Sequence, residues 1–419
     1  MTPFIAALVV SFCVCLLIVL TQRWHGHLTH DPAVGVQKAH STPVPRIGGL
    51  GIFLGLVAGW GVGPEQVHDT LEPILLAGLP ALAAGLLEDV TKRVGVTPRL
   101  LATMVSGLLI CVLTGHWLHR LDLPLVDQLL AHPPVAIAFT AFAVAGLANA
   151  INLIDGFNGL ASGTLAGCFA TFAVVAQAAG DEPLSIASGV LAAATLGFWL
   201  VNYPFGRLFM GDGGAYFGGF ALAWVAVLLP SRNPNVSPWE SLLVCAYPVI
   251  ETLYTVYRRL RDRQHPGMPD SRHLHSLLKT QWVMRLVPLW PRWARHALVC
   301  VPLWGFAALP AGLAIAMKDS PTTHLMLAFA GVVVAYHLLY QTLARDAQVH
   351  PIADAPSSEW LGGEDTPAGG AGQTGPTSQT GQGQRAVGQP APLPTSAAAS
   401  QKVGSPPPGS GDSGQLYGK

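Results

Sequence analysis

Residues 4–20 read FIAALVVSFCVCLLIVL and contain no charged side chain. An α-helix needs about 20 largely apolar residues to cross the hydrocarbon core of a bilayer, and this run comes close to that length. No basic segment precedes it, and charged sequence follows without a clear cleavage site of small residues. We therefore expect a retained first membrane span and not a cleaved signal peptide.

Ten further apolar runs bring the number of candidate spans to eleven. They are residues 47–62, 71–87, 100–118, 134–151, 160–179, 184–201, 215–230, 242–257, 297–317 and 325–343. The run at 71–87 is the least like an uninterrupted apolar span because it contains Glu72 and Pro80. The sequence predicts an all-α, polytopic integral membrane helix bundle with about eleven transmembrane helices.

The amino-acid composition also indicates a chain that is embedded in lipid. Hydrophobic residues make up 51% of it and charged residues only 11%, whereas about a quarter of a soluble domain is charged. The net charge is zero, so no basic field indicates nucleic acid as a partner. All six cysteines lie within apolar stretches and are interpreted as packing residues.

The distribution of lysine and arginine predicts the orientation in the membrane. Most of these side chains fall in the loops on one side, and only Arg120, Arg232 and Lys318 fall on the other. By the positive-inside rule we expect the N-terminus outside and the C-terminus inside. The odd number of spans depends on the run at 71–87.

The chain is expected to have two parts. Residues 1–345 form the membrane-embedded domain, and residues 346–419 are rich in Gly, Pro, Ser, Gln and Thr with few aliphatic side chains. Such a segment buries too little apolar surface to offset the entropy of ordering. We predict a disordered cytoplasmic tail.

With this topology the polar motifs all lie on the inward side. They are KAHSTPVPRIGG (38–49), EDVTKRVGVTPR (88–99), NAINLIDGFNG (149–159), NYPFGRLFMGDGG (202–214) and the loop 258–278, which contains PDSRHLHSLL. Five polar loops on one side of a membrane indicate a common site. This clustering is the main evidence for function.

Four carboxylates lie at inward helix ends: Glu88, Asp89, Asp155 and Asp212. One such residue alone is as well explained by solvation, but four together favour a functional site. Mg²⁺ takes oxygen ligands from one or two carboxylates and completes its shell with water and substrate phosphate. The sequence therefore predicts a Mg²⁺ site, with Mn²⁺ as the alternative cation.

Several polar and aromatic residues beside these carboxylates can be interpreted in two ways, as functional or as structural. Asn149, Asn152 and Asp155 share one face if their helix continues inward, although they also suit a polar helix end. Phe209 could stack on a nucleobase or anchor the next helix. His273 and His275 are two apart, which disfavours a helical zinc pair and leaves phosphate contact or acid–base work.

Taken in order, these motifs resemble the polyprenyl-phosphate N-acetylhexosamine-1-phosphate transferases, the superfamily that includes phospho-N-acetylmuramoyl-pentapeptide transferase. The resemblance covers about 38–278 and is carried by PRIGG (45–49), ED (88–89), NAINLIDGFNGLA (149–161), FMGDGG (209–214) and RHLHSLL (272–278). It implies a bacterial inner-membrane enzyme with its active site on the cytoplasmic side, which makes a lipid-linked precursor of a cell-envelope glycan or O-antigen.

The resemblance also implies substrates and roles. The enzyme would use Mg²⁺ to transfer a sugar-1-phosphate from a UDP-sugar to undecaprenyl phosphate and release UMP, and a homodimer is compatible with it. Asp212 is similar to the family's metal ligand. The implied catalytic residues are Glu88, Asp89, Asp155, His273 and His275. The implied substrate-binding residues are Lys38, Arg46, Asn149, Asn152, Asn202, Phe209 and Arg272.

Three positions differ from the family pattern. Glu88 stands where the family has the first of two aspartates, Ser276 replaces a third histidine, and Glu251 replaces an aspartate of the ninth helix.

The competing class is a secondary transporter of an anionic or lipid-linked substrate. Transporters place functional carboxylates near the middle of the bilayer and are built from matched halves. Here the carboxylates lie at inward helix ends and no matched halves are visible in the sequence.

Overall fold

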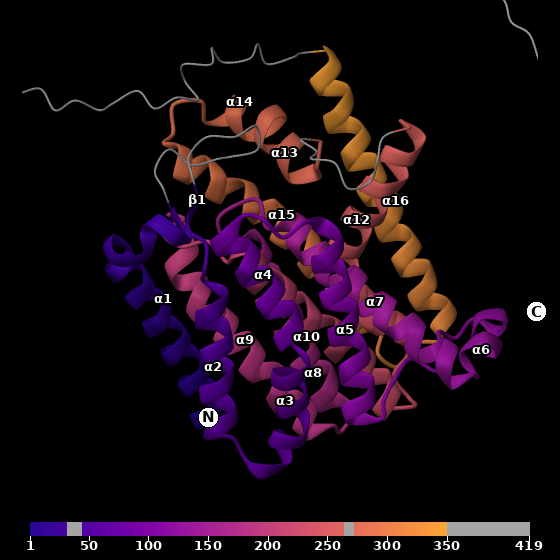
Figure 1. Cartoon of the computed structure of the whole chain (residues 1–419). Coiled ribbons are helices and arrows are strands. Elements are labelled where there is room, and N and C mark those ends of the chain that lie inside the picture. Colours follow the sequence, from indigo (N-terminus) through magenta and orange to yellow (C-terminus); the bar gives the residue numbers. More distant parts are fainter. Residues whose placement is uncertain (32–43, 264–271, 350–419) are drawn as a thin grey trace, which may run out of the picture. The chain divides into compact units, whose positions relative to one another are not determined.

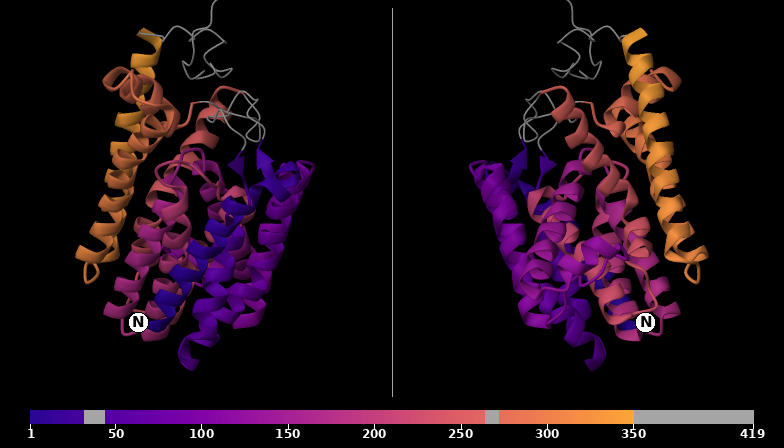
Figure 2. Two further views of the ribbon diagram at one scale, coloured as in Figure 1. Left: turned by 90° about the vertical axis from the view of Figure 1, so that its left-hand side faces the viewer. Right: turned by 90° about the vertical axis from the view of Figure 1, so that its right-hand side faces the viewer.

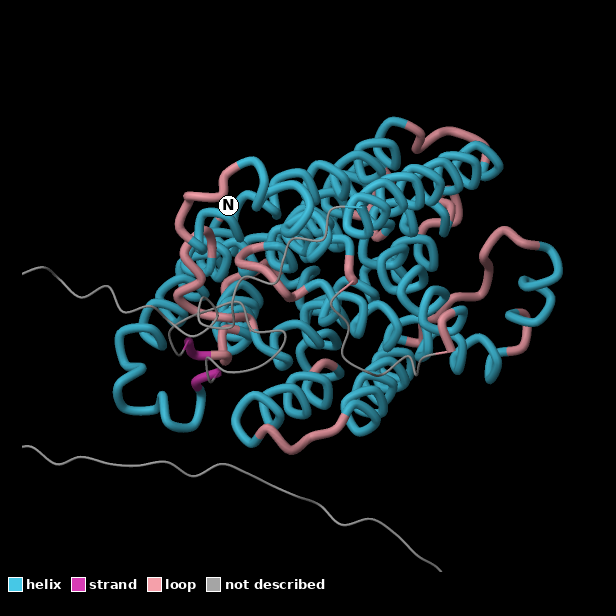
Figure 3. Tube along the Cα trace, turned by 90° about the horizontal axis from the view of Figure 1, so that it is seen from above, coloured by secondary structure: helices cyan, strands magenta, loops and turns pink. Residues whose placement is uncertain are grey.

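The computed structural model describes residues 1–31, 44–263 and 272–349. Nearly all of them are in helices (Figures 1 and 3). The helices are α1 (Thr2–Thr29), α2 (Gly49–Gly61), α3 (Glu65–Ala77), α4 (Leu79–Thr91), α5 (Val96–Thr114), α6 (Pro124–Leu130), α7 (Pro133–Ile154), α8 (Leu160–Ala178), α9 (Glu182–Asn202), α10 (Gly211–Arg232), α11 (Pro238–Val244), α12 (Ala246–Arg261), α13 (Leu274–Leu278), η1 (Lys279–Val283), α14 (Met284–Leu286), α15 (Arg292–Ala316) and α16 (Thr322–Val349). The strands β1 (His30–Asp31) and β2 (Val44–Pro45) pair antiparallel, with His30 opposite Pro45.

The predicted all-α membrane bundle is confirmed. Among the described residues eight helices are long and apolar enough to cross a membrane, or nine if the bent pair α3 and α4 counts as one span. All eleven predicted runs are helical, but the run at 47–62 is the 13-residue helix α2, and the run at 242–257 is divided at Cys245 between α11 and α12. By length and hydropathy, the described residues therefore contain fewer full-length spans than the eleven that the sequence predicts.

The break between α3 and α4 has a local cause. The two helices meet at Gly78 at an angle of 43°. Pro80 stands in the first turn of α4, where its missing N–H costs nothing, whereas in a continuous helix the same residue would remove a hydrogen bond. The Pro80 that made this run the least regular in the sequence thus begins a new helix.

The two ends of the described chain lie at opposite ends of the bundle. The N-terminus is at one end and the last turns of α16 are at the other (Figure 1). This placement agrees with an odd number of crossings; which end faces the cytoplasm stays a prediction. α16 continues to Val349, four residues beyond the predicted domain boundary, and the rest of the predicted tail lies outside the described residues.

Helix α10 forms the centre of the bundle. It packs on α2, α4, α7 and α8, and 94% of its most apolar window is buried, against 17% for α16. An all-round apolar helix is expected in such a position. α16 runs along one flank of the bundle, as the two side views in Figure 2 show.

Glycine lets α2 and α4 approach the first turn of α10. A Cβ atom added to Gly49 would lie 2.3 Å from the amide nitrogen of Gly214, and one added to Gly85 would lie 2.4 Å from that of Gly213. In lipid such close backbone contacts are a main source of helix association. The N-terminus of α10 is therefore enclosed by two neighbouring helices.

We expect Gly85→Ala to destabilise the protein because its methyl group would collide with the backbone of α10. Gly146→Ala on α7 is the control, since a Cβ there meets nothing within 4 Å and the higher helix propensity of alanine contributes about 1 kcal/mol. The measurement is the thermal unfolding midpoint of detergent-purified protein. Equal midpoints for the two variants would contradict the close approach of α4 and α10.

Candidate active site

The N-terminus of α10 is capped by Asp89, a residue of α4. The Asp89 carboxylate accepts hydrogen bonds from the backbone N–H groups of Asp212, at 3.0 Å, and Gly213, at 2.9 Å, and its side chain is fully buried. The first N–H groups of a helix have no partner within the helix, and a negative charge near them is stabilised by the helix dipole. Asp89 therefore joins α4 to the start of α10.

Gly211 begins α10 in a conformation that favours glycine. Its φ is +72°, and a Cβ atom there would strike the carbonyl oxygen of Arg46 and the carboxylate of Asp89. Only glycine fits this turn.

Asp212 contacts polar side chains from three other segments. Its Oδ1 lies 3.3 Å from a terminal nitrogen of Arg46 and accepts a hydrogen bond of 3.1 Å from the Asn152 amide. Its Oδ2 pairs with Arg99 at the start of α5. Arg46 also lies 3.5 Å from Asp89. Two carboxylates and two guanidinium groups thus meet at one helix end.

Backbone hydrogen bonds hold the Arg46 loop against the loop before α10. The N–H of Phe209 donates to the Pro45 carbonyl at 2.9 Å, and the N–H of Gly48 donates to the Phe209 carbonyl at 3.0 Å. Gly49 donates in the same way to Met210 at 2.9 Å. The positions of Arg46 and Phe209 are consequently fixed by one ladder, with the Phe209 ring half-buried.

The end of α7 adds Asn152 and Asp155. Besides donating to Asp212, Asn152 accepts a hydrogen bond of 3.3 Å from the Tyr216 hydroxyl. The helix stops at Ile154, so Asp155 begins the following turn instead of extending the helical face. Burial raises the pKa of Asp155 to about 7; Arg46 opposes this shift and Asp89 adds to it.

The histidine loop is held by Glu251 of α12. One Glu251 oxygen lies 3.2 Å from Nδ1 of His273 and accepts the N–H of Leu274 at 3.3 Å. The other accepts the Tyr336 hydroxyl of α16 at 2.8 Å. Thr255 lies 3.4 Å from the same histidine nitrogen. A buried carboxylate thus fixes the first residues of α13.

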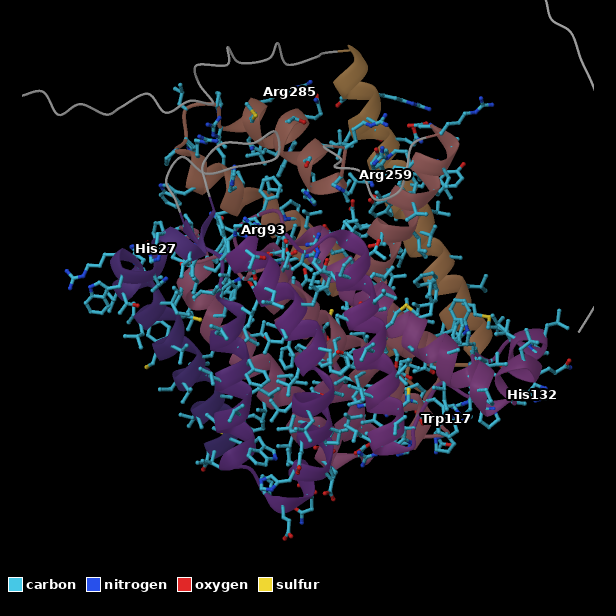
Figure 4. The ribbon with its side chains drawn as sticks, viewed as in Figure 1. His27, Arg93, Trp117, His132, Arg259 and Arg285 are labelled. Carbon is cyan, nitrogen blue, oxygen red and sulfur yellow. The ribbon has the colours of Figure 1, made fainter. Side chains whose placement is uncertain are left out.

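His275 connects this loop to the end of α7. Its ring stacks on that of His273 at 5.2 Å and meets the edge of Phe157, also at 5.2 Å. A Cβ atom on Gly156 would lie 3.1 Å from Nε2 of His275. Because Gly156 directly follows Asp155, the histidine pair adjoins the acidic cluster. Figure 4 shows the polar side chains gathered at this end of the bundle, near the labelled Arg93.

Other predicted site residues make contacts of a different kind. Glu88 accepts the N–H of Val94 at 2.7 Å and closes the turn after α4. Asn149 donates to the Ala145 carbonyl at 2.8 Å and lies 3.5 Å from Thr103 of α5.

The remaining candidates lie at a helix end or in loops. Asn202 donates to the Leu208 carbonyl at 2.6 Å and so holds the loop before α10. Arg272 pairs with Asp262 at 2.9 Å. Lys38 lies outside the described residues. Their roles toward a substrate stay predictions.

Three residues that the sequence did not assign to the site belong to it. Arg99 is the last residue of the predicted inward motif 88–99 and had no role of its own there, and Glu251 was named only as a difference from a family pattern. Tyr216 lies four residues after Asp212, a spacing that places both on one face of a helix. The Arg99 guanidinium also lies over the Tyr216 ring, at 5.8 Å.

Sequence comparison finds known proteins that are similar to this chain. The family model described as "Glycosyl transferase family 4" matches residues 72–230, which include Asp89, Asn152 and Asp212. A Bacillus subtilis protein named "Probable undecaprenyl-phosphate N-acetylglucosaminyl 1-phosphate transferase" is 29% identical over 243 residues, 58% of this chain and 67% of the relative.

Two enterobacterial proteins named "Undecaprenyl-phosphate alpha-N-acetylglucosaminyl 1-phosphate transferase" show similar likeness. That of Escherichia coli K12 is 27% identical over 249 residues, and that of Yersinia pestis is 26% identical over 247 residues. Both alignments cover 58% of this chain and 67% of the relative. The motifs, the membrane bundle and these relatives agree in showing that the chain is similar to glycosyl transferase family 4 and to its polyprenyl-phosphate hexosamine-1-phosphate transferases.

Proposed function

We propose that this protein transfers a sugar-1-phosphate, an N-acetylhexosamine-1-phosphate by the names of its relatives, from a UDP-sugar to undecaprenyl phosphate. The products are an undecaprenyl-diphosphate sugar and UMP. The observation that carries the proposal is the meeting of Asp89, Asp212, Arg46 and Arg99 at the N-terminus of a buried helix, at one end of the bundle. Such a site reaches a water-soluble donor while the lipid acceptor stays in the bilayer.

The chemistry suits these residues. An oxygen of the lipid phosphate attacks the phosphorus that carries the sugar, a new P–O bond forms, and the P–O bond to UMP breaks with its electron pair leaving on UMP. Phosphoryl transfer requires mainly that the phosphates be held in line and that their charge be stabilised. Arg46 and Arg99 supply guanidinium groups, which bind phosphate oxygens well. The lipid phosphate is already ionised near neutral pH, so the reaction needs no residue as a base.

Mg²⁺ is part of the proposal. Among the described residues no group of three or more His, Cys, Asp or Glu side chains could enclose a metal ion. A Mg²⁺ site would therefore take one or two carboxylates from the protein, and water and substrate phosphates would complete its shell. We assign Asp212 as the ligand, with Asp155 as the second carboxylate, and the ion would neutralise charge on the diphosphate when bound. Mn²⁺ is the alternative.

The remaining roles follow the site's geometry. Phe209 is half-buried and its backbone is bonded to the Arg46 loop, where its ring would stack on the uracil, and Asn152 and Asn202 would contact the same nucleotide. His273 and His275 would contact the donor diphosphate from the Asp155 side. We place the enzyme in a bacterial inner membrane with this site facing the cytoplasm, where it would start a cell-envelope glycan.

The direct test uses membranes that contain the protein, undecaprenyl phosphate and a panel of radiolabelled UDP-sugars. Label that moves into the organic phase only when both substrates and the protein are present supports the proposal. A transporter, the alternative class, would move label across sealed vesicles without making an extractable product.

We expect Asp212→Asn to lower transfer about 100-fold or more because an amide supplies no anionic oxygen for Mg²⁺. Glu182→Gln, an exposed carboxylate at the start of α9, is the control and should keep full activity. Both are assayed at saturating Mg²⁺ with the organic-phase assay. Near-normal turnover of Asp212→Asn would remove Asp212 from the metal site.

Asp89→Asn should both abolish most activity and lower stability. One amide oxygen replaces two acceptors, and the amide NH₂ then faces a backbone N–H of α10, at a cost of about 1–3 kcal/mol. The thermal unfolding midpoint of the purified protein, compared with that of Asp212→Asn, separates the two effects. An unchanged midpoint for Asp89→Asn would contradict its capping role.

Glu251→Gln should lower kcat about tenfold, with little change in the KM for the UDP-sugar, because His273 loses its anionic partner while the donor's other contacts remain. Glu251→Asp, which restores the family's residue, should recover most of the loss. The control is Glu240→Gln, another buried glutamate, on α11. If Glu251→Gln and Glu240→Gln behave alike in steady-state kinetics, Glu251 does not position the histidine loop.

A further inference from the structure

A cavity of about 640 Å³ lies between α3, α5 and α10, far from Asp212. Asp212 stands at the beginning of α10 and Arg232, which lines the cavity, at its end; a helix of 22 residues is about 33 Å long. Trp117, the neighbour of the lining residue His116, is labelled in Figure 4 at a distance from Arg93 and the active-site end. The transfer reaction makes no use of this cavity.

One wall of the cavity is acidic. Asp69 and Glu72 line it from α3, and their spacing of three places them on one face of that helix. Both residues are exposed, and within the described ranges neither carboxylate has a hydrogen bond or an ion pair. Two carboxylates so placed are suited to bind a group that donates several hydrogen bonds and carries positive charge.

Two other lining residues, Arg232 and His116, are basic. Arg232 directs one terminal nitrogen to Asp181 at 3.0 Å and the other toward Thr70 at 3.4 Å, and His116 uses Nδ1 on Ser231 at 3.1 Å. In the part of the chain that the structure describes, Nε of Arg232 and Nε2 of His116 have no such partner. These nitrogens remain available to an anion.

Trp224 gives independent evidence for a ligand. Its side chain is fully buried and lines the cavity, and its indole N–H has no acceptor among the described residues. A buried donor without a partner costs about 1–3 kcal/mol. An oxygen atom of a bound molecule would satisfy it.

The mouth of the cavity is apolar. Leu76 and Leu113 line it and are 50% and 52% exposed. In a chain that spans a membrane such side chains contact acyl chains. The cavity thus offers an acidic wall, a basic wall and an apolar edge to a single occupant.

We propose that this cavity binds a phospholipid with a primary ammonium headgroup, of the phosphatidylethanolamine type. The ammonium group donates hydrogen bonds to Asp69 and Glu72. The phosphate oxygens accept from the lining residues Arg232, His116 and Trp224. A volume of about 640 Å³ lies within the usual range of small-molecule sites and holds the headgroup with the glycerol.

The test is competitive lipid binding to the detergent-purified full-length protein. Mixed micelles supply equimolar dioleoyl phosphatidylethanolamine, phosphatidylglycerol and phosphatidylcholine, and native mass spectrometry counts the adducts. We expect phosphatidylethanolamine adducts to exceed each of the others about fivefold or more, because only its headgroup combines positive charge with N–H donors. Equal retention of the three lipids, or preferred retention of phosphatidylglycerol, would overturn the proposal.

Two sets of variants locate the binding. The double variant Asp69→Asn with Glu72→Gln should lose the preference for phosphatidylethanolamine, whereas Glu65→Gln, which removes one carboxylate charge from α3 outside the cavity, should keep it. Trp224→Phe should weaken all three lipids alike, because each has a phosphate. Unfolding midpoints confirm that the variants fold. A preference that survives the double variant places the lipid elsewhere and refutes the assignment.

Discussion

The hydrogen bonds from the first turn of α10 to the Asp89 carboxylate support the rest of the structure. The first N–H groups of a helix have no partner within the helix, so at this closely packed start of α10 they need acceptors from the protein. Asp89 supplies two such acceptor oxygens from a neighbouring helix. Because Asp89 is occupied in this way, the next carboxylate, Asp212, is left to face Arg46, Arg99 and Asn152.

Glycine makes that capping geometrically feasible. Gly49 and Gly85 bring α2 and α4 into backbone contact with Gly214 and Gly213, and a side chain at either place would push the helices apart. The same approach carries Arg46 to Asp212 through the ladder between Pro45 and Phe209. Packing and electrostatics at the site therefore have one origin, the close approach of backbones at the start of α10.

The histidine loop depends on a second buried carboxylate. One Glu251 oxygen accepts a hydrogen bond from the start of α13, and the other accepts one from Tyr336 of α16. α16 lies far beyond the residues that the family model matches, yet it helps to fix a loop next to Asp155. The last membrane helix thus contributes to the site without supplying a residue that faces it.

The sequence by itself predicted the class of fold, the family resemblance and most of the residues that meet at the candidate site. Length and hydropathy are local properties, so the apolar runs predicted the helices, and the motifs named Asp89, Asp155, Asp212 and the two histidines. The sequence could not decide which carboxylate caps a helix and which pairs with arginines, because Asp89 and Asp212 have the same side chain and only their partners differ.

Only the tertiary structure showed that Arg99, Tyr216 and Glu251 contact residues of the candidate site. Their roles depend on contacts between residues that are far apart in the sequence, such as Arg99 and Asp212, which are 113 positions apart. It also divided the run at 242–257 and bent the run at 71–87, since breaks in a membrane helix are tolerated only where neighbouring helices cover the backbone. Hydropathy records how apolar a segment is, whereas packing decides where its helix ends and which polar groups meet there.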